Sequence, residues 1–117
     1  MKALVNQIQL IGHVGADAEV KTTVQGTKMS RLRIATNERT KLKNGEWKET
    51  TQWHQCVVWG PLNEVVEQLG KKGNQLMVCG SLNYRVYTDA EGVKRTIPEI
   101  KVREILVLKN QYNLEVG

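Results

Sequence analysis

The stretch TTQWHQCVVWGPLNEVVEQLG, residues 50–70, joins a strand pattern directly to a helix pattern. Residues 50–59 are rich in β-branched and aromatic side chains, which favour strands. After Pro61 the spacing changes to that of one helical face, with apolar residues at Leu62, Val65, Val66 and Leu69. Proline suits the first turn of a helix, and Gly70 suits its end. We therefore predict a strand over 50–59 and one short helix over 61–69.

Alternation of apolar and polar residues marks the remaining strands. We expect strands over 5–14 and 29–36 before the quoted stretch, and over 74–87 and 96–108 after it. Pro98 has no amide hydrogen, so it should lie at a sheet edge or a bulge. The predicted core combines the apolar faces of these strands and of the helix: Ile8, Leu10, Leu32, Ile34, Cys56, Val58, Leu62, Val65, Val66, Leu69, Leu76, Val78, Ile100 and Val102.

The predicted order is three strands, one helix and two strands. An OB-fold has this order, being a five-stranded Greek-key β-barrel with its helix between the third and fourth strands. An SH3-like barrel or a small α+β sheet is the alternative, and the position of the helix favours the OB-fold. We predict an all-β OB-fold domain over 1–110, followed by a short extension over 111–117 that lacks an acidic tail.

The length and charge of the chain limit the classes of function that it can have. The chain has 117 residues, enough for one domain, and a formal net charge of +5. A basic balance suits a polyanionic partner, although many basic proteins are merely soluble. No apolar run approaches the roughly 20 residues of a membrane helix, and no signal region precedes the first strand. We expect a cytoplasmic protein with no membrane association.

Catalysis finds little support in the sequence. His13, His54, Cys56 and Cys79 show none of the close spacings of metal sites, and both cysteines lie in apolar stretches typical of buried free thiols. Gly12-His13-Val14-Gly15 lacks the Gly-Lys-Ser/Thr of a phosphate loop and is interpreted as a turn. We therefore predict no enzyme, no cofactor and no metal.

Two tryptophans on one strand face are the first candidate binding residues. Trp53 and Trp59 alternate with Cys56 and Val58, which suit the barrel interior. Tryptophan on a strand is either a core residue or a stacking platform. Because the interior side is already apolar, we expect both indoles on the outer surface, where every nucleobase offers a π-face to stack.

Cationic residues accompany these indoles. Arg31 and Arg33 lie on the polar face of the second strand, and Arg85 shares a face with Tyr87. Residues 38–48 are interpreted as a long loop that projects as a hairpin, with further candidates at Lys41, Lys43 and Trp47. Most charged loops are simply solvated, but an indole on such a loop favours a binding partner. Single-stranded DNA is the predicted ligand, and single-stranded RNA remains open.

Several motifs in order resemble the bacterial-type single-stranded DNA-binding protein family. They are the opening 5–12, GEWKE and TQWH at 45–54, VVWG at 57–60, LGKKG at 69–73, GSL at 80–82 and YTD at 87–89. The resemblance implies a homotetramer that binds single-stranded DNA without strong sequence preference and protects it during replication, repair and recombination. It implies base stacking at Trp53, Trp59 and Tyr87, and a subunit contact at His54.

The sequence also departs from that family. Thr40 replaces a frequent aromatic base-stacker, Gln55 a basic residue and Pro61 a common lysine. Fewer stacking and ionic contacts imply weaker or more salt-sensitive binding. Without the family's acidic tail tip, we expect no tail-mediated recruitment of proteins. The alternative function is therefore an OB-fold protein-interaction module of the primosome-accessory type with weak nucleic-acid binding.

Overall fold

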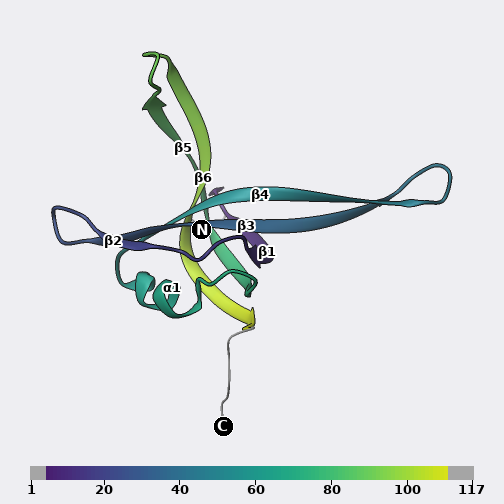
Figure 1. The fold of residues 1–117 in the computed structure, drawn as a ribbon, viewed down its shortest axis with the longest axis horizontal. Helices are drawn as coiled ribbons and strands as arrows, with labels where there is room; N and C mark the ends of the chain where they lie inside the picture. The colour runs from purple at the N-terminus through teal and green to yellow at the C-terminus, as the bar shows by residue number, and fades with distance from the viewer. Residues whose placement is uncertain (1–4, 111–117) are drawn as a thin grey trace, which may run out of the picture.

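Residues 5–110 fold into six strands and one short α-helix (Figure 1). The computed structural model describes residues 5–110. Its elements are β1 (Ile8–Val14), β2 (Val20–Thr22), β3 (Lys28–Lys41), β4 (Trp47–Trp59), a 3-10 turn η2 (Gly60–Leu62), α1 (Asn63–Leu69), β5 (Gln75–Thr88) and β6 (Lys94–Lys109). The predicted extension over 111–117 lies outside the described residues.

The strands close into a barrel. Their order is β1-β5-β6-β4-β3-β2, and a further β1–β3 pairing joins the two sides. Strands β1, β3, β4, β5 and β6 make the five-stranded barrel, with α1 between β4 and β5 in the chain, so the OB-fold prediction is confirmed. The three-residue β2, which pairs with β3, was not predicted, because so short a segment carries no readable alternation.

The core follows the predicted apolar faces. Leu32, Ile34, Cys56, Val58, Leu76, Val78, Ile100 and Val102 are buried together with Val66 of α1. Val14 also belongs to this core, although it was not predicted. Val65 and Leu69 are only partly buried, because a helix of seven residues presents a narrow stripe to the barrel.

Two glycines permit the barrel strands to approach each other closely. A Cβ on Gly12 would overlap the carbonyl oxygen of Ala35, and a Cβ on Gly80 would overlap that of Lys101. The interpretation of Gly12 as a turn residue is therefore wrong. It lies inside β1, next to the β1–β3 pairing that closes the barrel.

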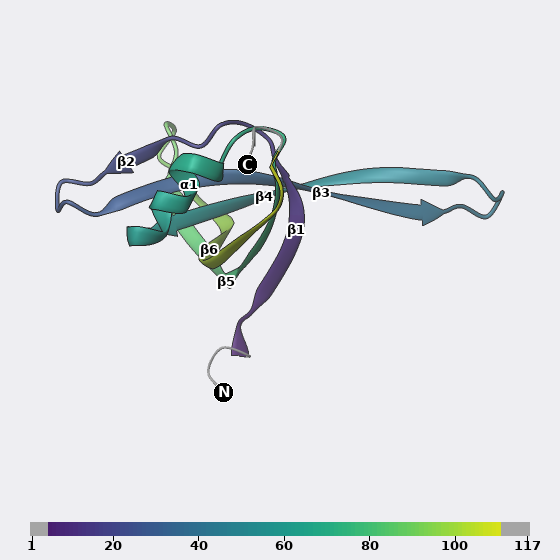
Figure 2. The ribbon, with the colours of Figure 1, turned by 90° about the horizontal axis from the view of Figure 1, so that it is seen from below.

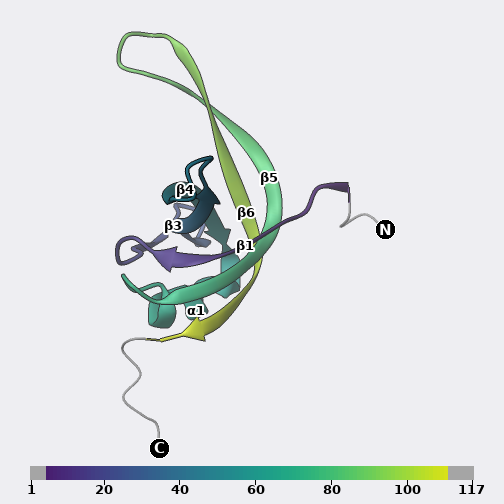
Figure 3. The ribbon, with the colours of Figure 1, turned by 90° about the vertical axis from the view of Figure 1, so that its right-hand side faces the viewer.

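Two hairpins extend beyond the barrel as arms. The β3–β4 arm runs to one side (Figures 1 and 2), and the β5–β6 arm curves away in another direction (Figure 3). The prediction of a loop over 38–48 is wrong in its extent, because β3 and β4 stay paired as far as Lys41 and Trp47. Pro98 lies on the β5–β6 arm, where β6 no longer pairs with β4, so its predicted edge position is confirmed.

The buried thiol of Cys56 offers a test of the core. Both cysteines are free, and burial raises the pKa of Cys56 to about 12. In a Cys79→Ser variant, we expect no reaction of Cys56 with a thiol reagent at pH 8 in the folded state, and rapid reaction after denaturation. Rapid reaction of the folded variant would show that Cys56 is not in a closed core.

Candidate nucleic-acid interface

One face of the β3–β4 ribbon carries all three tryptophans of the chain. The register runs without interruption from Met29↔Trp59 to Lys41↔Trp47. Alternate residues of both strands therefore share one face. We call this surface the ribbon face; it comprises Met29, Arg31, Arg33, Ala35, Asn37, Arg39, Lys41, Trp47, Glu49, Thr51, Trp53, Gln55, Val57 and Trp59.

The indoles on the ribbon face are exposed and evenly spaced. Trp47, Trp53 and Trp59 are 57%, 49% and 45% exposed, so none is a core residue. Each is six residues from the next, which corresponds to roughly 20 Å along a strand. The exposure of Trp53 and Trp59 agrees with their predicted position on the outer surface. The ribbon face extends along β4 from the barrel to the end of the arm.

Trp53 is held by two neighbours. The Arg33 guanidinium carbon lies 4.5 Å from the centroid of the indole, a cation–π contact. The edge of the ring lies against Gly15, where any Cβ would overlap it. The indole is thus fixed on one face and one edge while about half of its surface remains exposed. Gly15 was predicted only as a turn residue.

Trp47 has a similar arrangement at the end of the arm. The Arg39 guanidinium carbon lies 5.0 Å and the Lys41 Nζ 6.0 Å from its ring centroid. Arg39 was not among the predicted binding residues, although it continues the alternation of Arg31 and Arg33 along the same strand. Lys43 lies in the turn between β3 and β4 and makes none of these ring contacts.

Tyr87 and Arg85 lie on the other arm. The Arg85 guanidinium carbon lies 5.5 Å from the centroid of the Tyr87 ring, and Tyr87 is 38% exposed. Arg85 and Arg31 are joined through Glu99, whose Oε2 accepts hydrogen bonds from Arg85 Nε at 3.0 Å and Arg31 Nε at 3.4 Å. The Glu99 side chain is only 8% exposed. No local pattern singles out Glu99, because its importance comes from neighbours on two other strands.

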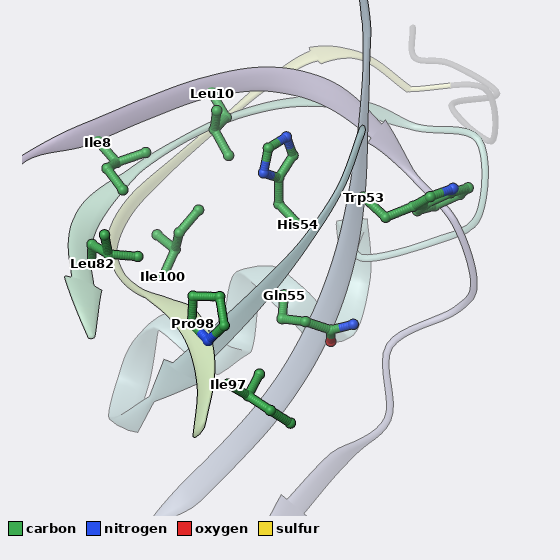
Figure 4. A pocket seen from close by; sticks show the side chains of 9 residues that line it. All are labelled: Ile8, Leu10, Trp53, His54, Gln55, Leu82, Ile97, Pro98 and Ile100. Carbon is green, nitrogen blue, oxygen red and sulfur yellow. The ribbon is translucent and has the colours of Figure 1, made fainter. Parts of the chain in front are cut away.

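His54 points to the opposite side of β4 from Trp53. Figure 4 shows it on the same side as Leu10 and Ile100, whereas Trp53 points away. Its Nε2 lies 2.8 Å from Thr36 Oγ1, so the two side chains share a hydrogen bond. His54 lines an open, largely apolar pocket of about 310 Å³ together with Ile8, Leu10, Leu82, Ile97, Pro98 and Ile100, and Trp53 and Gln55 of the ribbon face border the same pocket. Trp53 and His54 therefore point to opposite sides of β4, as predicted.

The described part of the chain holds neither a candidate metal site nor a membrane-spanning helix. Residues 5–110 contain no cluster of three or more His, Cys, Asp or Glu side chains that could hold a metal ion. Over the same residues, no helix is long and apolar enough to cross a membrane.

The barrel, its helix and its aromatic, cationic outer face place the chain among OB-fold proteins. Residues 5–108 match the single-strand binding protein family, and the chain belongs to that family. Its proteins are non-enzymatic, so the prediction that this chain is not an enzyme is confirmed.

Related proteins from several organisms support this assignment. The chain is 41% identical over 117 residues to single-stranded DNA-binding protein 1 of Xylella fastidiosa (strain 9a5c), covering 98% of this chain and 86% of the relative. It is 34% identical over 104 residues to a single-stranded DNA-binding protein of Xanthomonas axonopodis pv. citri, covering 89% of this chain and 58% of that relative. The solved structure of the Plasmodium falciparum SSB complex with ssDNA matches with a TM-score of 0.82 at 30% identity, covering 89% of this chain and 95% of that one.

Proposed function

We propose that this protein binds single-stranded DNA without strong sequence preference, by stacking bases on the ribbon face. The observation that carries the proposal is the row of three exposed, evenly spaced indoles with cations between them. Stacking on an indole contributes roughly 1–3 kcal/mol per base and tolerates any base, because each has a π-face. The names of the related proteins and the similarity to a complex with ssDNA point to the same ligand.

The cations supply the second part of the mechanism. The Arg33 guanidinium lies over the Trp53 ring, and an arginine held over an aromatic ring still has N–H groups that can donate to a phosphate. Arg39 and Lys41 have the corresponding position beside Trp47, and Arg85 beside Tyr87. A strand of DNA lying along β4 therefore meets a ring and a cation at Trp53 and again at Trp47, and Tyr87 with Arg85 offers the same pair on the β5–β6 arm. Arg31 and the turn residue Lys43 add further charge for the backbone.

Such binding suits a protein that covers transient single strands during replication, repair and recombination. Contacts to rings and phosphates carry no sequence information, so any exposed strand is bound. In a duplex the bases are already stacked and paired, and their faces are unavailable to the indoles. The same geometry explains both the tolerance of sequence and the preference for a single strand.

Competition between nucleic acids tests this proposal. With a fluorescent oligo-dT as tracer, we expect unlabelled single strands of any sequence to compete, and a matched duplex to compete far less. The affinity should fall steeply as salt increases, because bound phosphates release their counterions. A matched RNA strand decides between DNA and RNA. Failure of oligo-dT to bind, with retention of a protein partner instead, would favour the protein-interaction alternative.

We infer further that the chain forms a homo-oligomer, a homotetramer by resemblance to its family, with His54 at a subunit contact. In support, His54 borders the largely apolar pocket described above, and its side chain points to the opposite side of β4 from Trp53. A second copy covering this surface would remove exposed apolar groups from water.

Native mass spectrometry tests the oligomer. We expect a tetramer for the native chain and a smaller species for His54→Glu, because the new carboxylate would be buried at the contact without a partner. The matched control is Trp59→Ala, which alters an exposed ring of the ribbon face that does not line the pocket and should remain a tetramer. A native chain that is monomeric at micromolar concentration would contradict the inference.

A further inference from the structure

Glu99 is a buried carboxylate in contact with two of the proposed DNA-binding arginines. Its side chain is 8% exposed, whereas those of Arg31 and Arg85 are 46% and 40% exposed. The three residues come from β6, β3 and β5, so the contact exists only in the folded barrel. The Glu99 Oε2 accepts from the Nε of both arginines.

This arrangement lowers the charge that the two arginines offer to DNA. Burying a carboxylate is unfavourable unless cations or donors compensate it, and here both arginines provide that compensation. The triad carries a formal charge of +1 instead of the +2 of two unpaired arginines. The terminal nitrogens of each guanidinium can still donate to a phosphate, but the carboxylate beneath repels the same phosphate.

Arg33 provides a comparison within the same strand. It lies two residues from Arg31 on the ribbon face and contacts Trp53. Within residues 5–110, no carboxylate forms an ion pair with Arg33. The strand therefore presents one arginine already paired with an acid and another that is unpaired.

We propose that Glu99 competes with DNA phosphates for Arg31 and Arg85, and thereby limits the affinity of the protein for single-stranded DNA. The proposal rests on the proposed function. A protein that must later release its strand benefits from a built-in acid, since part of the cationic surface is already neutralised before the strand arrives. Glu99 thus tunes binding without touching the DNA.

Glu99→Gln tests the competition, because it removes the charge and keeps the shape. We expect the variant to bind oligo-dT roughly two- to tenfold more tightly at low salt, the factor expected for one partly exposed ion pair. The slope of log K against log salt should become steeper by about 0.7, the value for one added phosphate contact on a single strand. Glu64→Gln is the matched control: it removes the same charge from an exposed position on α1 and should change neither quantity appreciably.

A folded Glu99→Gln variant that binds oligo-dT no more tightly than Glu64→Gln would overturn the proposed competition by Glu99, and it would leave the proposed DNA-binding function standing. If Glu99→Gln does not fold, Arg31→Ala and Arg33→Ala decide the question. Arg33→Ala should reduce the salt slope by about 0.7, and Arg31→Ala by clearly less, because Glu99 already neutralises part of its charge. Equal reductions would overturn the proposal. A native chain that fails to bind oligo-dT overturns the proposed function as well.

Discussion

Replacing both Trp53 and Trp59 with alanine is expected to weaken binding of oligo-dT by about 2–6 kcal/mol, since each stacked base contributes roughly 1–3 kcal/mol. The two residues are 49% and 45% exposed, so their removal leaves no cavity in the core. We therefore expect the double variant to unfold at nearly the same denaturant concentration as the native chain. Fluorescence anisotropy of a labelled oligo-dT measures the first quantity, and urea unfolding the second.

Tyr84 supplies the control for this experiment. It is 64% exposed and lies on β5 between Asn83 and Arg85, so its side chain points away from the face that carries Arg85 and Tyr87. Tyr84→Ala removes an exposed aromatic ring of similar kind and should leave the affinity unchanged. The loss of affinity in Trp47→Ala should lie between those of Tyr84→Ala and the double variant, because Trp47→Ala removes one of the three indoles. Equal losses for Tyr84→Ala and the double variant would show that the ribbon face has no special role.

Asn63→Ala is expected to cost about 3–5 kcal/mol of unfolding free energy, because several buried groups lose their partners at once. Asn63 is fully buried at the start of α1. Its Nδ2 donates to the carbonyl oxygens of Lys28, Val58 and Gly60, each at 3.1 Å, and its Oδ1 accepts from the Ser30 hydroxyl. This one side chain joins β3, the end of β4 and the helix.

Chemical denaturation with urea measures that loss. The neighbouring Glu64→Ala changes an exposed residue of the same helix and should stay within about 0.5 kcal/mol of the native chain. An Asn63→Ala variant that loses less than about 1 kcal/mol, the net value of one ordinary hydrogen bond, would show that water replaces these bonds and that Asn63 does not join the elements.

Local pattern predicted the barrel and the facing of its central strand. The alternation around Cys56 and Val58 correctly assigns Trp53 to the outside and His54 to the opposite side, because side chains of a strand alternate strictly. The change of period at Pro61 correctly locates the helix. Both signals are contained in residues adjacent in the sequence.

The length of the arm and several site residues did not follow from local pattern. Beyond Thr36 both faces of β3 are polar, so no apolar alternation distinguishes a strand from a loop. Gly15 touches Trp53, and Glu99 joins Arg31 to Arg85, only because distant strands meet in the barrel. Such contacts depend on register, which a single sequence does not display. Of these site residues, only Arg39 could have been predicted from the sequence, by extending the alternation of Arg31 and Arg33 along the strand.

The central claim is that exposed indoles on the ribbon face stack on single-stranded bases, and intrinsic tryptophan fluorescence tests it most directly. We predict that oligo-dT strongly quenches the emission of the native chain, that high salt weakens the effect, and that a matched duplex does not produce it. The Trp53 and Trp59 double alanine variant should lose most of the quenching. Unchanged emission at oligo-dT concentrations that saturate binding would contradict base stacking on this face.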